Sequence, residues 1–203
     1  MRSAVTIDTR PYTDDYVKRH LDYLTGDWRL VFFGSEQNKD EVQRLYPDCL
    51  FYIWDCPQFS LEAYSDLLIS PEFWNNIPDE EILIFHNDSG LLKKGIEKFF
   101  FWDYVGSPWR SPMWGGNGGL SIRKRSISLK VIERQPIFRH WTHEDGYFCD
   151  CMINYGIGKL APRMVCEEFS CETIFKMGTY GYHNIRGYLK ENQVNLIMNQ
   201  YGS

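Results

Sequence analysis

In the first hundred residues, short runs of apolar side chains alternate with segments whose apolar residues recur every three or four positions. The continuous runs predict buried strands, and the spaced pattern predicts helices. We expect strands at 4–7, 28–34, 50–54 and 81–85, and helices at 14–24, 38–46, 61–68 and 71–76. This alternation predicts βαβ units, and therefore a mostly parallel sheet with helices on both faces.

The second half of the chain is less regular. An aromatic stretch at 99–106 is followed by a strand at 118–123 and by helices at 126–133 and 144–152. The 203 residues contain no internal repeat, low-complexity tract or obvious domain boundary. That length suits one large domain, so we expect a single α/β domain, either alone or as one domain of a longer chain.

Three loops follow predicted strands, at 8–11, 34–38 and 86–90. Ligands of parallel sheets bind outside the carboxyl ends of the strands, so these loops are candidate binding segments. Asp88 lies just beyond the apolar run at 82–85. A carboxylate there can hold a divalent cation, which in turn can hold a diphosphate. The alternative is a turn-forming Asp that caps the next segment.

A glycine-rich stretch at 114–119 leads into the strand expected at 118–123. Its glycines allow the backbone to approach a ligand closely, so the stretch is a candidate pocket wall. Glu144 and Asp145 follow in a separate segment. One of these acids could deprotonate an acceptor hydroxyl as a general base, while the other orients the acceptor. The alternative is an exposed helix start, where acids favour the helix dipole.

The histidines offer weaker signals. His183 lies in a segment with several glycines, which we expect to form a tight loop, and it could complete a metal site with Asp88. A lone histidine is more often structural. We expect His140 and His143 to be structural or to line a pocket, and His20 to lie on a helix surface.

The composition and charge of the chain limit the kinds of molecule that it can be expected to bind. The chain is 43% apolar and 16% aromatic, as an ordered globular protein is, and its formal net charge is -5. It has no long basic run, which argues against a nucleic-acid partner. The nearest basic cluster is Arg123-Lys124-Arg125, which we interpret as a solvated strand end, with a diphosphate contact as the alternative.

The six cysteines favour a reducing compartment, because none forms a CxxC pair and a chain of this size does not need disulfides. A zinc site from His143, Cys149 and Cys151 is disfavoured, because their spacing matches no known zinc pattern. Residues 1–10 do not resemble a signal peptide, and no segment approaches ~18 apolar residues. We therefore expect a cytoplasmic protein without a membrane span.

Several segments together resemble the small GT-A-type glycosyltransferases of algal viruses and assorted microbes, many of them known only as an uncharacterised glycosyltransferase-like family. The matching segments are 82–89, 101–109, 116–123, 144–145 and 181–183, with further similarity at 8–11 and in the strand at Trp28. Their order and spacing, rather than any one motif, carry the resemblance.

The resemblance implies a Rossmann-like GT-A domain with a nucleotide-sugar-binding half at 1–110 and an acceptor and catalytic half at 111–203. It also implies a hexosyltransferase-like enzyme that moves a sugar from a nucleoside-diphosphate sugar, expected to be a UDP-sugar, to a glycan hydroxyl. Mn²⁺ or Mg²⁺ would assist the transfer. If the chain is viral, the reaction would take place in the host cytoplasm.

The resemblance also assigns roles to residues. Asp88 takes the place of the last acid of the Asp-x-Asp motif, while His86 replaces the first acid, a departure that bears on metal dependence. Asp145, with Glu144 as its substitute, matches the catalytic acid of related inverting enzymes; in a retaining enzyme it would bind the donor sugar. Donor contacts are expected from Thr9, Arg10, Asn87, Asp88, Ser89, Asn117, Gly118 and Gly119, and metal ligation from Asp88 and His183.

Two other classes of function are alternatives to a glycosyltransferase. A carbohydrate- or nucleotide-sugar-binding module without turnover would agree with the aromatic content and with His86 in place of the acid. A sugar-phosphate nucleotidyltransferase would need a glycine-rich phosphate loop after the first strand, and residues 8–11 contain no glycine.

Overall fold

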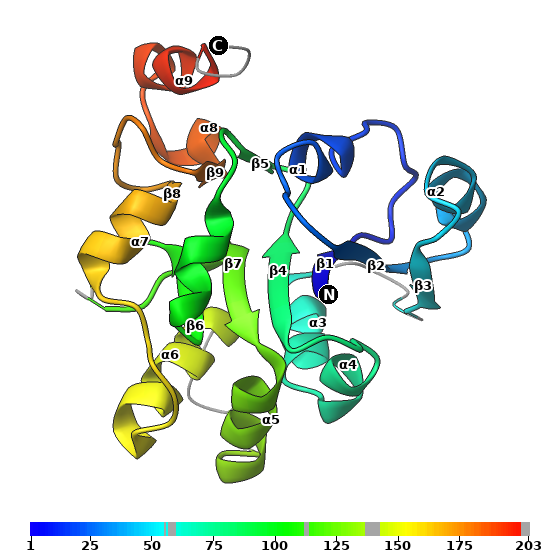
Figure 1. The fold of residues 1–203 in the computed structure, drawn as a ribbon, viewed down its shortest axis with the longest axis horizontal. Coiled ribbons are helices and arrows are strands. Elements are labelled where there is room, and N and C mark those ends of the chain that lie inside the picture. Colours follow the sequence, from blue (N-terminus) through cyan, green and yellow to red (C-terminus); the bar gives the residue numbers. More distant parts are fainter. Residues whose placement is uncertain (55, 57–59, 112–113, 137–142, 200–203) are drawn as a thin grey trace.

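The central sheet has six strands in the order β3-β2-β1-β4-β7-β6 (Figure 1). The computed structural model describes residues 1–54, 56, 60–111, 114–136 and 143–199. Strands β1 to β4 are parallel, whereas β7 is antiparallel to both β4 and β6. The strands are β1 (Arg2–Ile7), β2 (Trp28–Gly34), β3 (Leu50–Ile53), β4 (Glu81–Phe85), β6 (Tyr104–Ser107) and β7 (Asn117–Lys124).

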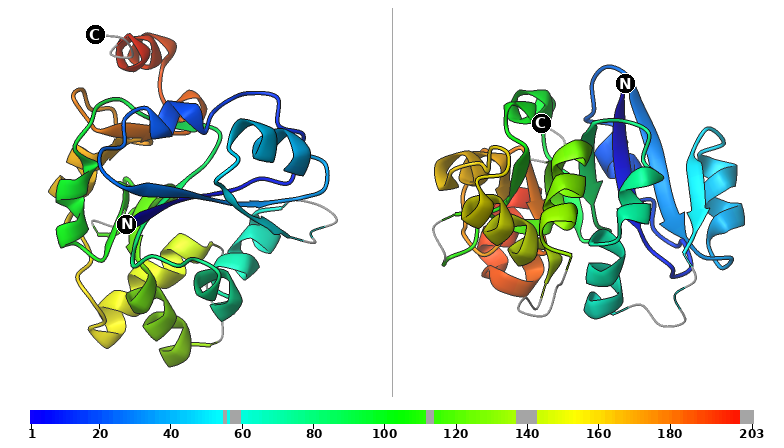
Figure 2. Two further views of the ribbon diagram at one scale, coloured as in Figure 1. Left: turned by 45° about the vertical axis from the view of Figure 1, so that its right-hand side comes forward. Right: turned by 90° about the horizontal axis from the view of Figure 1, so that it is seen from below.

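Helices cover both faces of this sheet, because successive strand residues point to opposite sides. In β1, Val5 packs in the apolar cluster of one face and Ala4 in that of the other. The first face carries α3 (Leu61–Leu68), α4 (Pro71–Asn75), α5 (Arg125–Arg134) and α6 (Glu144–Tyr155). The second carries α1 (Lys18–Leu21), α2 (Lys39–Leu45), η1 (Ile96–Phe101) and α7 (Arg163–Phe169). Figure 2 shows the two layers on either side of the sheet.

A smaller sheet lies beyond the carboxyl end of β4 (Figure 1). Its strands are β5 (Ser89–Leu91), β9 (Gly181–His183) and β8 (Ser170–Cys171), in that order, and the short helices α8 (Ile185–Tyr188) and α9 (Glu191–Met198) follow β9. Ser89 pairs with His183 across the β5–β9 ladder. The small sheet therefore brings the end of the chain beside the loop that follows β4.

The carboxyl edge of the central sheet is where we expect a ligand. Strand β1 pairs with β2 on one side and with β4 on the other, so the strand order changes direction there. Such a switch point is the usual ligand-binding position in open α/β sheets. Strand β7 begins at the same edge, with Leu120 opposite Phe85, and so brings the glycine-rich stretch beside the end of β4.

The structure confirms the α/β architecture, with a mostly parallel sheet between two layers of helices. Three local predictions are wrong. The helix expected at 14–24 is only Lys18–Leu21, and the loop expected around His183 contains strand β9. His20 is fully buried rather than on a helix surface. Its ring stacks on Phe85 with centroids 4.2 Å apart, because α1 lies against the sheet there.

No helix within the part of the chain that the structure describes combines the length and the apolar character needed to cross a membrane. The six cysteines, all within the described residues, form no disulfide with one another.

Candidate functional site

A cavity of about 620 Å³ lies at the carboxyl edge of the sheet. The loop after β4, the start of β7, the first turn of α6 and the end of β9 contribute to its walls. Its acidic and imidazole side chains are Asp88, Glu144, Asp145, Asp150, Glu172, His86, His143 and His183. Among the lining residues that the structure describes, none is lysine or arginine.

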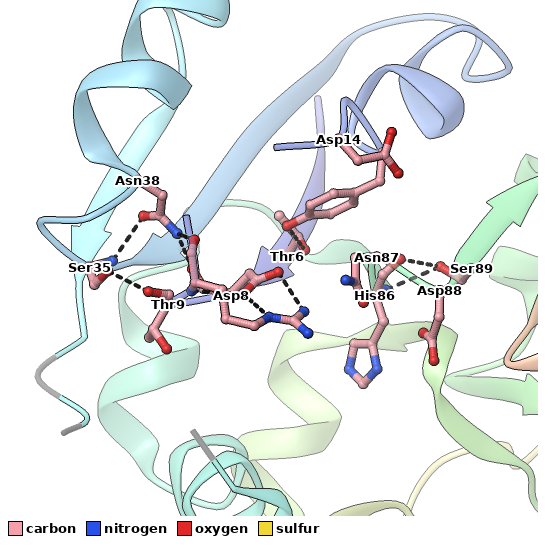
Figure 3. Close-up of polar contacts among 12 residues, drawn as sticks. Thr6, Asp8, Thr9, Asp14, Ser35, Asn38, His86, Asn87, Asp88 and Ser89 are labelled. Carbon is pink, nitrogen blue, oxygen red and sulfur yellow. Dashed lines mark hydrogen bonds and ion pairs between the residues drawn. The ribbon is translucent and has the colours of Figure 1, made fainter. Parts of the chain in front are cut away.

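His86, Asp88 and His183 each present a potential metal ligand, and these three atoms lie within 4.8 Å of one another. His86 and Asp88 point the same way from the loop after β4 (Figure 3). The Ser89 hydroxyl closes this turn by donating to the His86 carbonyl at 2.7 Å. The His86 N–H donates to the Gly119 carbonyl at 2.8 Å, and the Asn184 N–H to the Asp88 carbonyl at 3.0 Å. Backbone contacts from β7 and from the end of β9 therefore fix the cluster.

His183 lies between two carboxylates. Its Nε2 is 3.3 Å from Asp88 Oδ1, and its Nδ1 is 3.2 Å from Glu172 Oε1. Burial lowers the pKa of His183, but the hydrogen bonds and charges of Asp88 and Glu172 outweigh it and raise the pKa to about 9. Burial likewise raises the pKa of Asp88, but His183 more than offsets this and the pKa lies below its usual range. The imidazole is thus cationic at neutral pH when no other cation is present.

His86 differs from His183 in that its Nε2 is buried and has no hydrogen-bond partner among the described residues. Burial, and secondarily the charge of His183, lowers the pKa of His86 to about 3, so the ring is neutral. A buried neutral nitrogen without a partner is costly unless it binds something. Two imidazoles and one carboxylate form a donor set that divalent transition metals accept, so these residues fit a metal ion.

Gly118 and Gly119, near the start of β7, allow Glu144 and His183 to lie close to the backbone of this strand. A Cβ at Gly119 would lie 2.1 Å from His183 Nε2, and one at Gly118 would lie 2.2 Å from Glu144 Oε1. Any larger side chain would overlap these groups. Both glycines line the cavity, as does Asn117.

Glu144 is buried and forms a two-pronged ion pair with Arg123, with N–O distances of 2.6 and 2.9 Å. The Arg123 guanidinium lies 4.8 Å from the centroid of the Tyr104 ring, and the residue is 0% exposed. Neither an exposed helix start at Glu144 nor a solvated strand end at Arg123 is therefore correct. The two charges are buried together because each neutralises the other.

Asp145 also lines the cavity and is 8% exposed. Its carboxylate accepts hydrogen bonds from the Gly118 N–H at 3.2 Å and from the Gly146 N–H at 2.7 Å. Burial, followed by the neighbouring charge of Glu144, raises the pKa of Asp145 to about 7 against the opposing effect of these backbone donors. A carboxyl group with such a pKa exchanges its proton readily near neutral pH.

Four residues predicted to contact the donor lie outside the set of described residues that line the cavity: Thr9, Arg10, Asn87 and Ser89. Thr9 and Arg10 are in the loop after β1, where the Ser35 hydroxyl and the Asn38 amide hold their carbonyls (Figure 3). Asn87 is exposed in the turn between His86 and Asp88, and Ser89 is buried, with its hydroxyl 2.9 Å from His20 Nε2. Their binding roles stay predictions.

The remaining histidines and cysteines are also placed. His143 is exposed and lines the cavity, as expected for a pocket residue, whereas His140 lies outside the described residues. Cys149 and Cys151 are buried in the core, and neither belongs to the cluster of potential metal ligands found among the described residues.

Sequence reasoning missed two features of the site. His86 follows an apolar strand as part of a His-x-Asp pattern, and that pattern could have indicated it as a ligand. Glu172 gave no local signal, because only the pairing of β8 with β9 brings it beside His183.

A family model matches residues 53–184, which include His86, Asp88, Gly118, Asp145 and His183. The chain belongs to this family, described as Protein of unknown function (DUF5672). None of the curated proteins matches this DUF5672 chain.

Two solved structures are similar to this DUF5672 chain in fold. One is the apo-form glycosyltransferase GlyE of Streptococcus pneumoniae TIGR4, with a TM-score of 0.60 and 10% identity over 94% of this chain. The chain spans 55% of that structure's length. The other is apo mouse xyloside xylosyltransferase 1, with a TM-score of 0.59 and 9% identity over 94% of this chain and 100% of that one. These similarities confirm the predicted GT-A-like fold.

Proposed function

We propose that this chain is a glycosyltransferase that moves a sugar from a nucleoside-diphosphate sugar to a hydroxyl of a glycan acceptor. The observation that carries the proposal is one cavity that combines the His86, Asp88 and His183 cluster with the buried carboxylate of Asp145. The position of the cavity at the switch point of a GT-A-like fold supports it. The resemblance noted from the sequence favours UDP as the nucleotide.

The charge of the cavity supports a metal-assisted reaction. The described lining includes no lysine or arginine, so a diphosphate there would face several carboxylates, with the His183 imidazolium as the cationic side chain among the described lining residues. His86, Asp88 and His183 would hold a divalent cation, which when bound would neutralise the diphosphate and make it a better leaving group. Because two of these three donors are imidazoles, the set favours Mn²⁺ over Mg²⁺, which prefers oxygen ligands.

Asp145 would accept the proton of the acceptor hydroxyl. It lines the cavity, and its pKa of about 7 leaves a useful fraction ionised at neutral pH. Glu144 would serve as a support, because both of its oxygens bind Arg123 and its charge helps to raise the pKa of Asp145. If the reaction retains configuration, Asp145 would bind the donor sugar instead.

The two halves of the chain would divide the substrates. In residues 1–110, Thr9 and Arg10 would bind the base or ribose, and Asn87, Asp88 and Ser89 would shape the diphosphate site. In residues 111–203, Asn117, Gly118 and Gly119 would line the donor sugar, next to Asp145. Trp109 and Tyr188 line the same cavity and offer ring faces for the acceptor.

Nucleoside-diphosphate release from a panel of UDP-, GDP- and CDP-sugars, with Mn²⁺, Mg²⁺ or chelator, tests the proposal. We expect slow hydrolysis of one donor without acceptor, faster with Mn²⁺ than with Mg²⁺. Asp88→Ala should lower it at least ~100-fold, since it removes a ligand of the cluster. Asp22→Ala is the matched control, because that aspartate pairs with Lys18 on the surface of the molecule.

Binding of a glycan without consumption of any donor in the panel would contradict the enzyme assignment and favour a carbohydrate-binding module. Full activity of Asp88→Ala would contradict the metal assignment while leaving a transferase possible.

A further inference from the structure

Glu172 is a buried acid directly after β8, and its carboxylate faces the ring of His183. The residue is 1% exposed. Cys171 pairs with Tyr182 in the parallel β8–β9 ladder, so the residues that follow them in the chain, Glu172 and His183, lie side by side. The contact is thus built into the second sheet rather than made by a mobile surface side chain.

The two oxygens of this carboxylate have different surroundings. Oε1 lies 3.2 Å from His183 Nδ1, whereas Oε2 is buried and has no hydrogen-bond partner among the described residues. An incompletely paired buried carboxylate is costly to the folded state. An apolar side chain would fill the same space without that cost, so packing alone does not account for an acid at this position.

The effect of Glu172 on His183 follows from hydrogen-bond chemistry. An ionised carboxylate only accepts hydrogen bonds, so His183 Nδ1 must carry a proton to bind it. When His183 binds a metal ion it gives up its second proton, and Nε2 is then the nitrogen that offers a lone pair. Nε2 is the atom that faces Asp88, at 3.3 Å, and it lies close against the backbone of Gly119. The ring is therefore held with its ligand atom directed toward the His86 and Asp88 side.

We propose that Glu172 is a positioning residue that fixes the tautomer and orientation of His183 for a divalent cation. Carboxylates that bind the second ring nitrogen of a metal-ligating histidine have this effect generally, and their loss typically weakens metal binding by about 10- to 100-fold. The inference rests on the metal site of the proposed function. It adds an acid that would not touch the cation but sets how tightly the cluster binds it.

The test measures Mn²⁺ binding without nucleotide, by electron paramagnetic resonance of free Mn²⁺, together with the melting temperature in the absence of metal. Glu172→Leu removes the acceptor, and Glu172→Gln keeps an acceptor oxygen but removes the charge. We expect Mn²⁺ affinity to fall by about 10- to 100-fold in Glu172→Leu and by less in Glu172→Gln. Glu168→Gln is the control, because it removes the same charge from an exposed acid that pairs with Lys98.

Three outcomes are informative. A folded Glu172→Leu variant with wild-type Mn²⁺ affinity would overturn the positioning role and leave the proposed function intact. If that variant does not fold, Glu172→Gln decides: a loss of at least ~3-fold supports the role, and wild-type affinity overturns it. No Mn²⁺ binding by the wild-type protein would contradict the metal site itself, and the role of Glu172 with it.

Discussion

At the scale of single residues, Asp145 and Glu144 show how two adjacent acids come to differ. Glu144 binds Arg123 through both oxygens, whereas the donors to Asp145 among the described residues are two backbone N–H groups. Burial therefore raises the pKa of Asp145 to about 7, and Glu144 adds to the effect by repulsion. Environments that give neighbouring titratable groups different pKa values in this way are typical of acid–base sites.

The pKa of Asp145 predicts a pH profile. A general base works only when ionised, so kcat/KM should rise about tenfold per pH unit below about 7 and level off above it. Asp145→Asn should lower kcat by about 10²- to 10⁴-fold and abolish this rise. Steady-state rates between pH 5 and 9 provide the measurement, with the exposed Glu133→Gln as a control that keeps the profile. An unchanged profile in Asp145→Asn would show that another group is the base.

The position of a single residue could be predicted where that residue follows a strand with a clear apolar run. Asp88 could be placed at a strand end because the apolar run before it is unmistakable. The burial of His20 and Arg123 could not be foreseen, since each depends on partners far along the chain: Ser89 for His20 and Glu144 for Arg123. Local sequence marks both as polar and therefore as surface residues.

At the scale of elements, the Arg123–Glu144 pair joins β7 to the first turn of α6. The pair holds the start of α6 at the cavity and so places Asp145 there. The arginine lies over the rings of Tyr104 and Phe148, with centroid distances of 4.8 and 5.2 Å, which adds cation–π attraction. This buried pair therefore connects the stability of the fold to the geometry of the site.

Breaking the pair should be costly. Arg123→Met leaves a buried carboxylate without its partner and is expected to lower the free energy of unfolding by about 3–5 kcal/mol. Adding Glu144→Leu removes that unpaired charge, so the double variant should be more stable than Arg123→Met alone. Urea denaturation of both variants and of the wild type provides the measurement. A single variant within about 1 kcal/mol of the wild type would mean that Glu144 finds another partner or is hydrated.

Whether a helix or strand could be predicted from the sequence depended on the length of that element. Strands β1 to β4 and β7 and the helices α5 and α6 have enough apolar residues for their periodicity to be read, and they lie within a few residues of where we expected them. Strands β5, β8 and β9 are two or three residues long and have no readable period. They exist because they pair with one another, which local sequence does not reveal.

At the scale of the whole molecule, the candidate site depends on segments that lie far apart in the chain. Asp88 comes from the end of β4, whereas His183 comes from a second sheet near the carboxyl terminus. The ladder between β4 and β7 crosses the expected boundary at residue 110, so the central sheet is continuous between the two halves. The α/β class was predictable from alternating patterns, but this convergence required the tertiary structure.

The central claim is that this cavity binds a nucleoside diphosphate through a divalent cation held by His86, Asp88 and His183. Calorimetric titration of UDP, with GDP and CDP as alternatives, with and without Mn²⁺, tests it most directly. We predict that one nucleotide binds at least ~10-fold more tightly with Mn²⁺, and that Asp88→Ala removes this gain. Equal affinity with and without Mn²⁺, or no binding of any of the three, would contradict the account.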